Sequence, residues 1–121
     1  MDYKIAKELI HLCDWLSRVE TIVELGEQAY LSDPLLQEAG DSLMMKIGEV
    51  SGRLSRAGMA PPAGINWADA IGNRNWVIHQ YDEIDREITW NTLSDSVISW
   101  AKLLEPICQE AEKSLASGTG R

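Results

Sequence analysis

Apolar side chains recur along most of the chain at intervals of three and four residues, the period of an α-helix that buries one face. The first stripe predicts a helix over about residues 2–27. The second predicts a helix that begins at Pro34, where Asp33 can cap the helix and proline suits the first turn. The two stripes are Ile5, Leu9, Leu12, Leu16, Val19 and Val23, then Leu36, Ala39, Leu43, Ile47, Val50 and Leu54.

Two further helices follow a loop rich in glycine and proline at residues 56–64. Asn66 offers the next cap, which predicts a short third helix over residues 67–79. Asp85 can cap a fourth helix, inside which Pro106 should kink the helix or end its regular hydrogen bonding. The stripe of this fourth helix is Trp90, Leu93, Val97, Trp100, Leu104, Ile107 and Ala111.

No strand-like alternation competes with these helices, and the chain has no internal repeat. The pattern therefore predicts an all-α protein, an antiparallel bundle of four main helices. We expect a single domain over residues 1–115 and a flexible tail at residues 116–121. The apolar stripes are interpreted as core faces. Those of the first and fourth helices are regular enough to form the seam of a homodimer as well.

The composition narrows the range of partners. The chain of 121 residues carries a net charge of −8 and has a pI near 4.6, which argues against the broad basic surface that duplex DNA requires. A local pocket for one or two phosphates is compatible with this charge. No apolar run reaches the length of a membrane span and no signal peptide is recognisable, so we expect a cytoplasmic protein that makes no membrane contact.

The two cysteines, Cys13 and Cys108, lie far apart and have no histidine or cysteine at metal-binding spacing, so we expect no metal site. We interpret them as two reduced, packed thiols of a cytosolic protein, and a long-range disulfide is the open alternative.

The segment "GNRNWVIHQYDEID" at residues 72–85 gathers a cation, an imidazole and a phenol. On a regular helix Asn75 and His79 share one face, whereas Arg74 and His79 point about 140° apart. One straight helix therefore cannot aim Arg74, His79 and Tyr81 at a common point. Either the helix ends near His79 and Tyr81 swings back from a loop, or two copies of the segment meet across a symmetric dimer.

The pattern Arg-x4-His-x-Tyr, from Arg74 to Tyr81, resembles the motif of HEPN-domain ribonucleases. With "LSDPLLQEA", "KIGEVSGRLS" and "INWADAIGNRNWVIHQYDEIDREITWNTL", roughly residues 30–105 resemble the HepT toxin family of toxin–antitoxin pairs. Two positions depart from that family. Gln80 stands where glycine is common, which affects backbone freedom beside the histidine, and Arg86 stands where proline is common, which changes only the helix start.

The resemblance implies a HEPN-like homodimer with a cleft at its two-fold axis, and metal-independent cleavage of RNA in that cleft without a cofactor. It also implies a nucleotidyltransferase-fold antitoxin of the MntA type, encoded alongside the toxin. Such an antitoxin can attach AMP to the motif tyrosine, which in this chain is Tyr81.

The residue types fit this chemistry, because RNA supplies its own nucleophile in the 2′-hydroxyl. His79 can accept or donate a proton, and Arg74 can grip a phosphate and stabilise the charge of the transition state. Asn75 can orient His79 or bind substrate. Tyr81 can bond a phosphate oxygen or become the modified hydroxyl. Glu49 can reach the cleft and bond Arg74, although a solvated surface glutamate is an equal alternative.

A second function stays open at this stage, namely a catalytically silent helical module that binds and regulates a nucleotidyltransferase partner. The acidic charge favours this module, since a ribonuclease profits from a positive field. The presence of both Arg74 and His79 favours the ribonuclease, because a scaffold needs neither. Arg74 also has a purely structural reading, in which it pairs with Asp69 or Asp82.

Overall fold

The computed structural model describes residues 1–80 and 82–117, and this part of the chain contains helices and no strands. The all-α prediction is therefore confirmed. The elements are α1 (Tyr3–Leu25), α2 (Glu27–Ser32), α3 (Pro34–Arg56), α4 (Trp67–Gln80), α5 (Arg86–Asn91), the π-helix η1 (Thr92–Val97) and α6 (Ile98–Ala116). Of the predicted tail, the last four residues lie outside the described residues, as does Tyr81.

The helix starts are set by local side-chain caps, as the sequence predicts. Asp33 accepts a hydrogen bond from the Leu35 amide at 2.9 Å, and Asp85 accepts one from the Glu87 amide at 3.0 Å. The first predicted helix is shorter than expected, because it ends at Gly26 with a φ of 95° that glycine adopts without strain. The short helix α2 follows this break and was not predicted.

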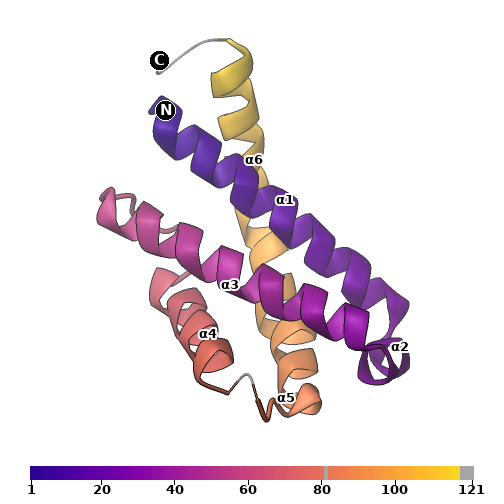
Figure 1. Ribbon diagram of the computed structural model, residues 1–121. Coiled ribbons are helices and arrows are strands. Elements are labelled where there is room, and N and C mark those ends of the chain that lie inside the picture. The colour runs from indigo at the N-terminus through magenta and orange to yellow at the C-terminus, as the bar shows by residue number, and fades with distance from the viewer. Residues whose placement is uncertain (81, 118–121) are drawn as a thin grey trace.

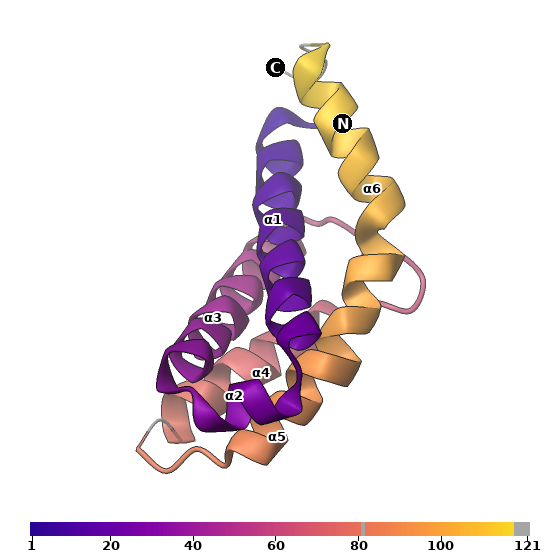
Figure 2. The ribbon, with the colours of Figure 1, turned by 90° about the vertical axis from the view of Figure 1, so that its right-hand side faces the viewer.

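The long helices stack in the order α4, α3, α1 and α6 (Figure 1). α3 lies between α1 and α4, and α1 packs along the antiparallel α6, so that α1 begins where α6 ends. At the opposite end of the molecule α2 meets α5 (Figure 2). The predicted stripes line the core, where Leu9, Leu12, Val50, Leu93 and Leu104 are almost fully buried. No helix of the described chain is both long and apolar enough to cross a membrane.

The fourth predicted helix exists as one continuous helical run made of α5, η1 and α6. Pro106 lies inside α6 and does not end it, since the helix continues to Ala116. The π-helix at its centre was not predicted. Its buried residues Leu93 and Val97 keep the spacing of the flanking α-helical turns, so the apolar pattern carries no sign of the different hydrogen bonding.

The structure corrects the interpretation of the two cysteines. Cys13 on α1 and Cys108 on α6 form a disulfide, with their Cα atoms 6.2 Å apart and 95 residues of separation along the chain. The alternative left open by the sequence is therefore the one observed. Sequence separation could not decide the matter, because the antiparallel packing of the first and last long helices is what brings the two sulfur atoms together.

Candidate functional site

Helix α4 carries the motif, and its first turn is fixed at two points. Asn66 caps the helix by accepting a hydrogen bond from the Ala68 amide at 3.1 Å. The indole of Trp67 is buried, donates to the Met59 carbonyl at 3.0 Å and packs edge-on against Trp100 with 5.9 Å between ring centroids. Contacts of residues that precede the motif in the sequence thus fix the position of α4 in the bundle.

The middle of α4 lies directly on the backbone of α3 at Gly48. A Cβ atom built on Gly48 would lie 2.7 Å from the Ala70 carbonyl oxygen and 3.2 Å from Arg74 Cγ, and closer still to Arg74 Cβ. Only glycine leaves room for this approach, which seats the stem of Arg74 on α3. Gly48 was not predicted as a site residue. Its signal in the sequence is a glycine within an otherwise apolar helical stripe.

Arg74 is half-buried and has no carboxylate partner among residues 1–80 and 82–117. Its Nε is buried without a hydrogen-bond partner among the described residues, and its Nη2 donates to Asn75 Oδ1 at 3.3 Å. A purely structural role for Arg74 would require an ion pair with Asp69 or Asp82. Neither pair is present among the described residues. A guanidinium with a fixed stem and unmatched charge is free to bind an external anion.

His79 is exposed in the last turn of α4, which ends at Gln80. Asn75, one turn earlier, is exposed on the same face. The helix therefore ends beside His79, as the first of the two predicted arrangements requires, while Tyr81 lies outside the described residues. Because α4 is continuous from Arg74 to His79, these two side chains leave the helix about 140° apart. A single chain does not bring them together.

Glu49 is exposed on α3 and forms no hydrogen bond with Arg74 within the described part of the chain. Its charge acts instead on Arg53. The pKa of Arg53 is raised above its ordinary value, chiefly by the hydrogen bonds with Glu8 at 3.0 Å and to a smaller extent by the charges of Glu8 and Glu49. In the single chain Glu49 is therefore a solvated surface residue.

Two cavities lie beside the motif and not within it. A cavity of about 390 Å³ is bounded by α3, α4, η1 and α6, and a neighbouring cavity of about 310 Å³ shares Met44, Gly72 and Asn73 with it. Neither is lined by Arg74, Asn75 or His79. The motif residues therefore occupy an open surface of α4. No three His, Cys, Asp or Glu side chains of the described residues gather closely enough to hold a metal ion.

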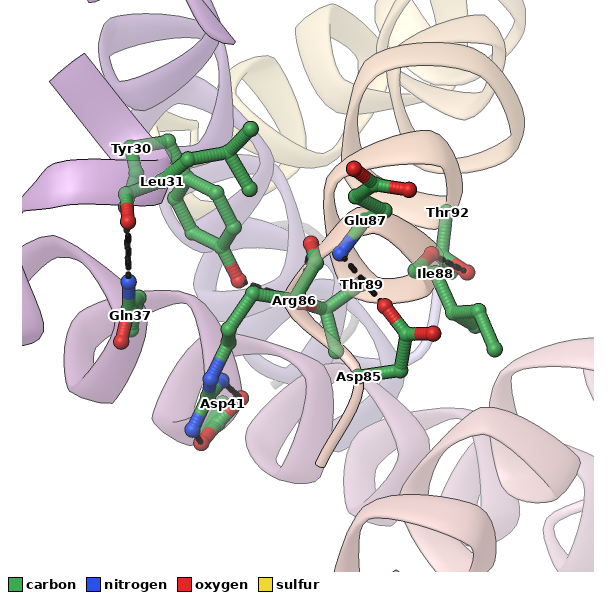
Figure 3. Close-up of polar contacts among 10 residues, drawn as sticks. All are labelled: Tyr30, Leu31, Gln37, Asp41, Asp85, Arg86, Glu87, Ile88, Thr89 and Thr92. Atoms are coloured by element: carbon green, nitrogen blue, oxygen red, sulfur yellow. Dashed lines mark hydrogen bonds and ion pairs between the residues drawn. The ribbon is translucent and has the colours of Figure 1, made fainter. Parts of the chain in front are cut away.

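The chain that follows the motif is anchored by a buried polar network at the start of α5 (Figure 3). Arg86 donates to both carboxylate oxygens of Asp41 on α3, at 2.7 and 3.0 Å, and these hydrogen bonds are the main cause of its raised pKa. The hydroxyls of Tyr30 and Thr89 lie 2.6 Å apart, and Thr89 donates to the Arg86 carbonyl at 3.1 Å. Arg86 thus joins α5 to α3, a contact that the sequence did not reveal.

These features define an all-α protein in which one helix carries a half-buried arginine at its middle and an exposed histidine in its last turn. The chain belongs to the HepT-like ribonuclease family, whose model, described as "Ribonuclease HepT-like", matches residues 12–107. It is also similar to the protein named "Putative RNase TTE0752" of Caldanaerobacter subterraneus subsp. tengcongensis, at 22% identity over 86% of this chain and 91% of that protein. No solved structure matches the chain.

Proposed function

We propose that this protein is a metal-independent endoribonuclease toxin that cuts RNA in a cleft between two copies of the chain. The observation that carries the proposal is the state of Arg74 in a HepT-like family member. Its stem is seated on Gly48, and its guanidinium has no carboxylate partner although the chain is strongly acidic. Four residues after Asn75, which Arg74 contacts, comes the exposed His79.

Two copies are needed because one α4 points Arg74 and His79 in different directions. In a symmetric dimer, Arg74 of one protomer can face His79 of its partner, and the same pairing recurs across the axis. The apolar surface beside the motif supports such a contact. Ile78, between the two motif residues on α4, is 43% exposed, and Ile88 on α5 is 48% exposed. Burial of these side chains would contribute to association.

The proposed reaction is an attack of the RNA 2′-hydroxyl oxygen on the adjacent phosphorus. His79 of one protomer accepts the proton of the hydroxyl, while Arg74 of the other binds the non-bridging oxygens and stabilises the added negative charge. The bond from phosphorus to the 5′ oxygen breaks, and this oxygen takes the proton that His79 removed from the 2′-hydroxyl. The products are a 2′,3′-cyclic phosphate and a 5′-hydroxyl. Asn75 holds Arg74, as its hydrogen bond at 3.3 Å suggests.

Control of this activity is proposed to come from a nucleotidyltransferase antitoxin of the MntA type. Tyr81 lies two residues after His79 in the chain. Transfer of AMP from ATP to its hydroxyl oxygen, with release of pyrophosphate, would place a bulky anion beside the histidine. That anion would compete with the RNA phosphate for Arg74.

A complementation assay tests the catalytic proposal. Purified Arg74→Ala and His79→Ala proteins should each lose cleavage of single-stranded RNA, whereas His11→Ala, at an exposed histidine stacked on Trp15 of α1, should keep it. After the two inactive variants are unfolded and refolded together, mixed dimers contain one intact site, so about a quarter of the wild-type activity should return. No cleavage by the wild-type protein, combined with tight binding of the nucleotidyltransferase, would instead establish the silent regulatory module that the net charge of −8 favours.

A further inference from the structure

The arginines of the described residues fall into two groups. Three form ion pairs: Arg18 with Asp14, Arg53 with Glu8 and Arg86 with Asp41. For the remaining two, Arg56 and Arg74, no carboxylate of the described part of the chain lies within ion-pair distance. In a chain with 19 acidic and 11 basic residues, unpaired arginines are unexpected, and both lie along the line where α3 meets α4.

Arg56 is the last residue of α3, is exposed, and folds back over its own helix toward α4. Its Nη1 lies 3.2 Å from the position of a Cβ built on Gly52, and Ile71 Cδ1 of α4 lies 3.9 Å from the same position. Gly52 follows Gly48 by one helical turn, roughly 6 Å along the axis. The guanidinium of Arg56 therefore lies about one turn away from the place where Arg74 is seated.

The position of Arg56 at a helix C-terminus gives a structural reason for a cation there, since the helix dipole favours positive charge. That reason does not account for the direction of the side chain. Arg53, one turn earlier on the same helix, turns toward α1 and takes Glu8 as its partner. Arg56 instead leaves its charge unmatched on the side of Ile71 and α4.

The residues then follow one another along α4 in a definite order. Arg56 and Ile71 both approach Gly52, Arg74 comes next with its bond to Asn75, and His79 lies in the last turn of the helix. Ile71, Asn75 and His79 are each four residues apart and share one face. A strand of RNA whose scissile phosphate is held by Arg74 would pass Arg56 with the rest of its backbone.

We propose that Arg56 binds a second backbone phosphate of the RNA, adjacent to the one that is cleaved, and so forms a phosphate subsite on the α3–α4 surface. The inference rests on the proposed ribonuclease function. Arg56 touches no reacting atom in this arrangement and contributes to binding alone. Because a phosphate is present at every nucleotide, the subsite adds affinity without adding sequence preference.

The test measures binding and cleavage separately. Binding uses a fluorescent single-stranded RNA with 2′-O-methyl groups, which lacks the nucleophile, and fluorescence anisotropy at several salt concentrations. Arg56→Gln should weaken binding about tenfold and reduce the slope of log K against log salt by about 0.7, the value for one lost contact to a single strand. Arg56→Lys should restore most of the affinity. Arg18→Gln, which removes the same charge on α1, should bind like the wild-type protein.

Cleavage of unmodified RNA completes the design. Arg56→Gln should raise KM about tenfold and change kcat less than twofold, at an unchanged melting temperature, which is the pattern of a lost binding contact. If the wild-type protein cleaves RNA but Arg56→Gln and Arg18→Gln behave alike, the subsite is refuted and the ribonuclease proposal stands. If Arg56→Gln lowers the melting temperature with an unaltered salt slope, Arg56 is structural and the subsite is refuted as well. If the wild-type protein neither binds nor cleaves RNA, both proposals fail.

Discussion

Arg74 and Arg86 flank the same short segment of chain, yet they occupy opposite kinds of environment. Arg86 is held by two hydrogen bonds with Asp41, next to the paired hydroxyls of Tyr30 and Thr89 (Figure 3). Arg74 has a buried Nε without a partner and one long hydrogen bond to an amide. The protein thus pairs one guanidinium with a carboxylate and leaves the other, twelve residues away, without a carboxylate partner among the described residues.

The difference teaches which cation belongs to the fold and which is available to a ligand. Removing one member of a buried ion pair leaves the charge of the other without compensation, and this destabilises the folded chain. An arginine whose donors are not all used costs stability, roughly 1–3 kcal/mol for a buried group, and such a cost is often found at functional sites. We therefore expect substitution of Arg74 to change activity and substitution of Arg86 to change stability.

The largest effect is expected for Arg74→Gln, which removes the charge that we propose stabilises the transition state. The value of kcat/KM for RNA cleavage should fall by about 10²–10³, the usual loss for one such donor. The melting temperature should stay the same or rise slightly, since the unsatisfied Nε disappears with the substitution. Steady-state cleavage and thermal unfolding of the same preparation measure both quantities. A marked loss of stability would show that Arg74, like Arg86, has a structural role.

The next effect is expected for Arg86→Gln, which leaves the Asp41 carboxylate on α3 without its partner. The free energy of unfolding should fall by about 2–3 kcal/mol, because both groups of the pair are largely buried and its two hydrogen bonds are charged. Cleavage per folded molecule should change less than threefold. Denaturant unfolding gives the stability, and Asp41→Asn/Arg86→Gln should recover part of it, because the uncompensated charge is then gone.

The sequence predicts the local features of this structure better than the contacts between distant residues. The helix caps at Asp33, Asn66 and Asp85 depend on residues two positions away, so the sequence predicted all three. The Arg86–Asp41 pair spans 45 residues and the cysteine pair spans 95, and neither has a local signal. The sequence predicted the helices and their caps, because apolar spacing and local hydrogen bonds determine them. It did not predict the ion pair or the disulfide, because these depend on which helices pack against each other.

The candidate site shows the same division. The motif placed Arg74 and His79 on one helix that ends beside the histidine, and both features are present in α4. The approach of α4 to Gly48 could not be foreseen, because the crossing point of two helices depends on the whole bundle. The proposed convergence of Arg74 and His79 on one phosphate requires a second copy of the chain, which is one of the two arrangements that the sequence predicts.

A smaller effect is expected for Gly48→Ala, which tests the seat of Arg74. The added methyl group would meet the Ala70 carbonyl oxygen at 2.7 Å, so α4 must shift away from α3. Overpacking of this kind costs about 1–3 kcal/mol, partly offset by the better helix propensity of alanine, and the displaced Arg74 should lower kcat about tenfold.

Gly72→Ala on α4 is the matched control for the Gly48→Ala substitution on α3. A Cβ atom at Gly72 meets nothing within 4 Å, so this variant should gain roughly 0.5–1 kcal/mol of stability and keep its activity. Equal kcat values for the two alanine variants would show that the close approach at Gly48 does not position the arginine.

The smallest effect is expected for Tyr30→Phe, which removes a single hydroxyl from the polar network around Arg86. Because Thr89 already donates its proton to the Arg86 carbonyl, the Tyr30 hydroxyl is the donor in the 2.6 Å contact between the two side chains. Its loss leaves Thr89 Oγ1 without one acceptor interaction but not without a partner, so stability should fall by about 1 kcal/mol. The ring still packs against Trp90 at 5.6 Å between centroids, and Asp41 still holds Arg86. Cleavage should therefore match that of the wild-type protein in parallel assays of denaturant unfolding and activity. A large loss of activity would mean that the network at α5 reaches the motif through the intervening loop, and the division between a structural and a functional arginine would no longer hold.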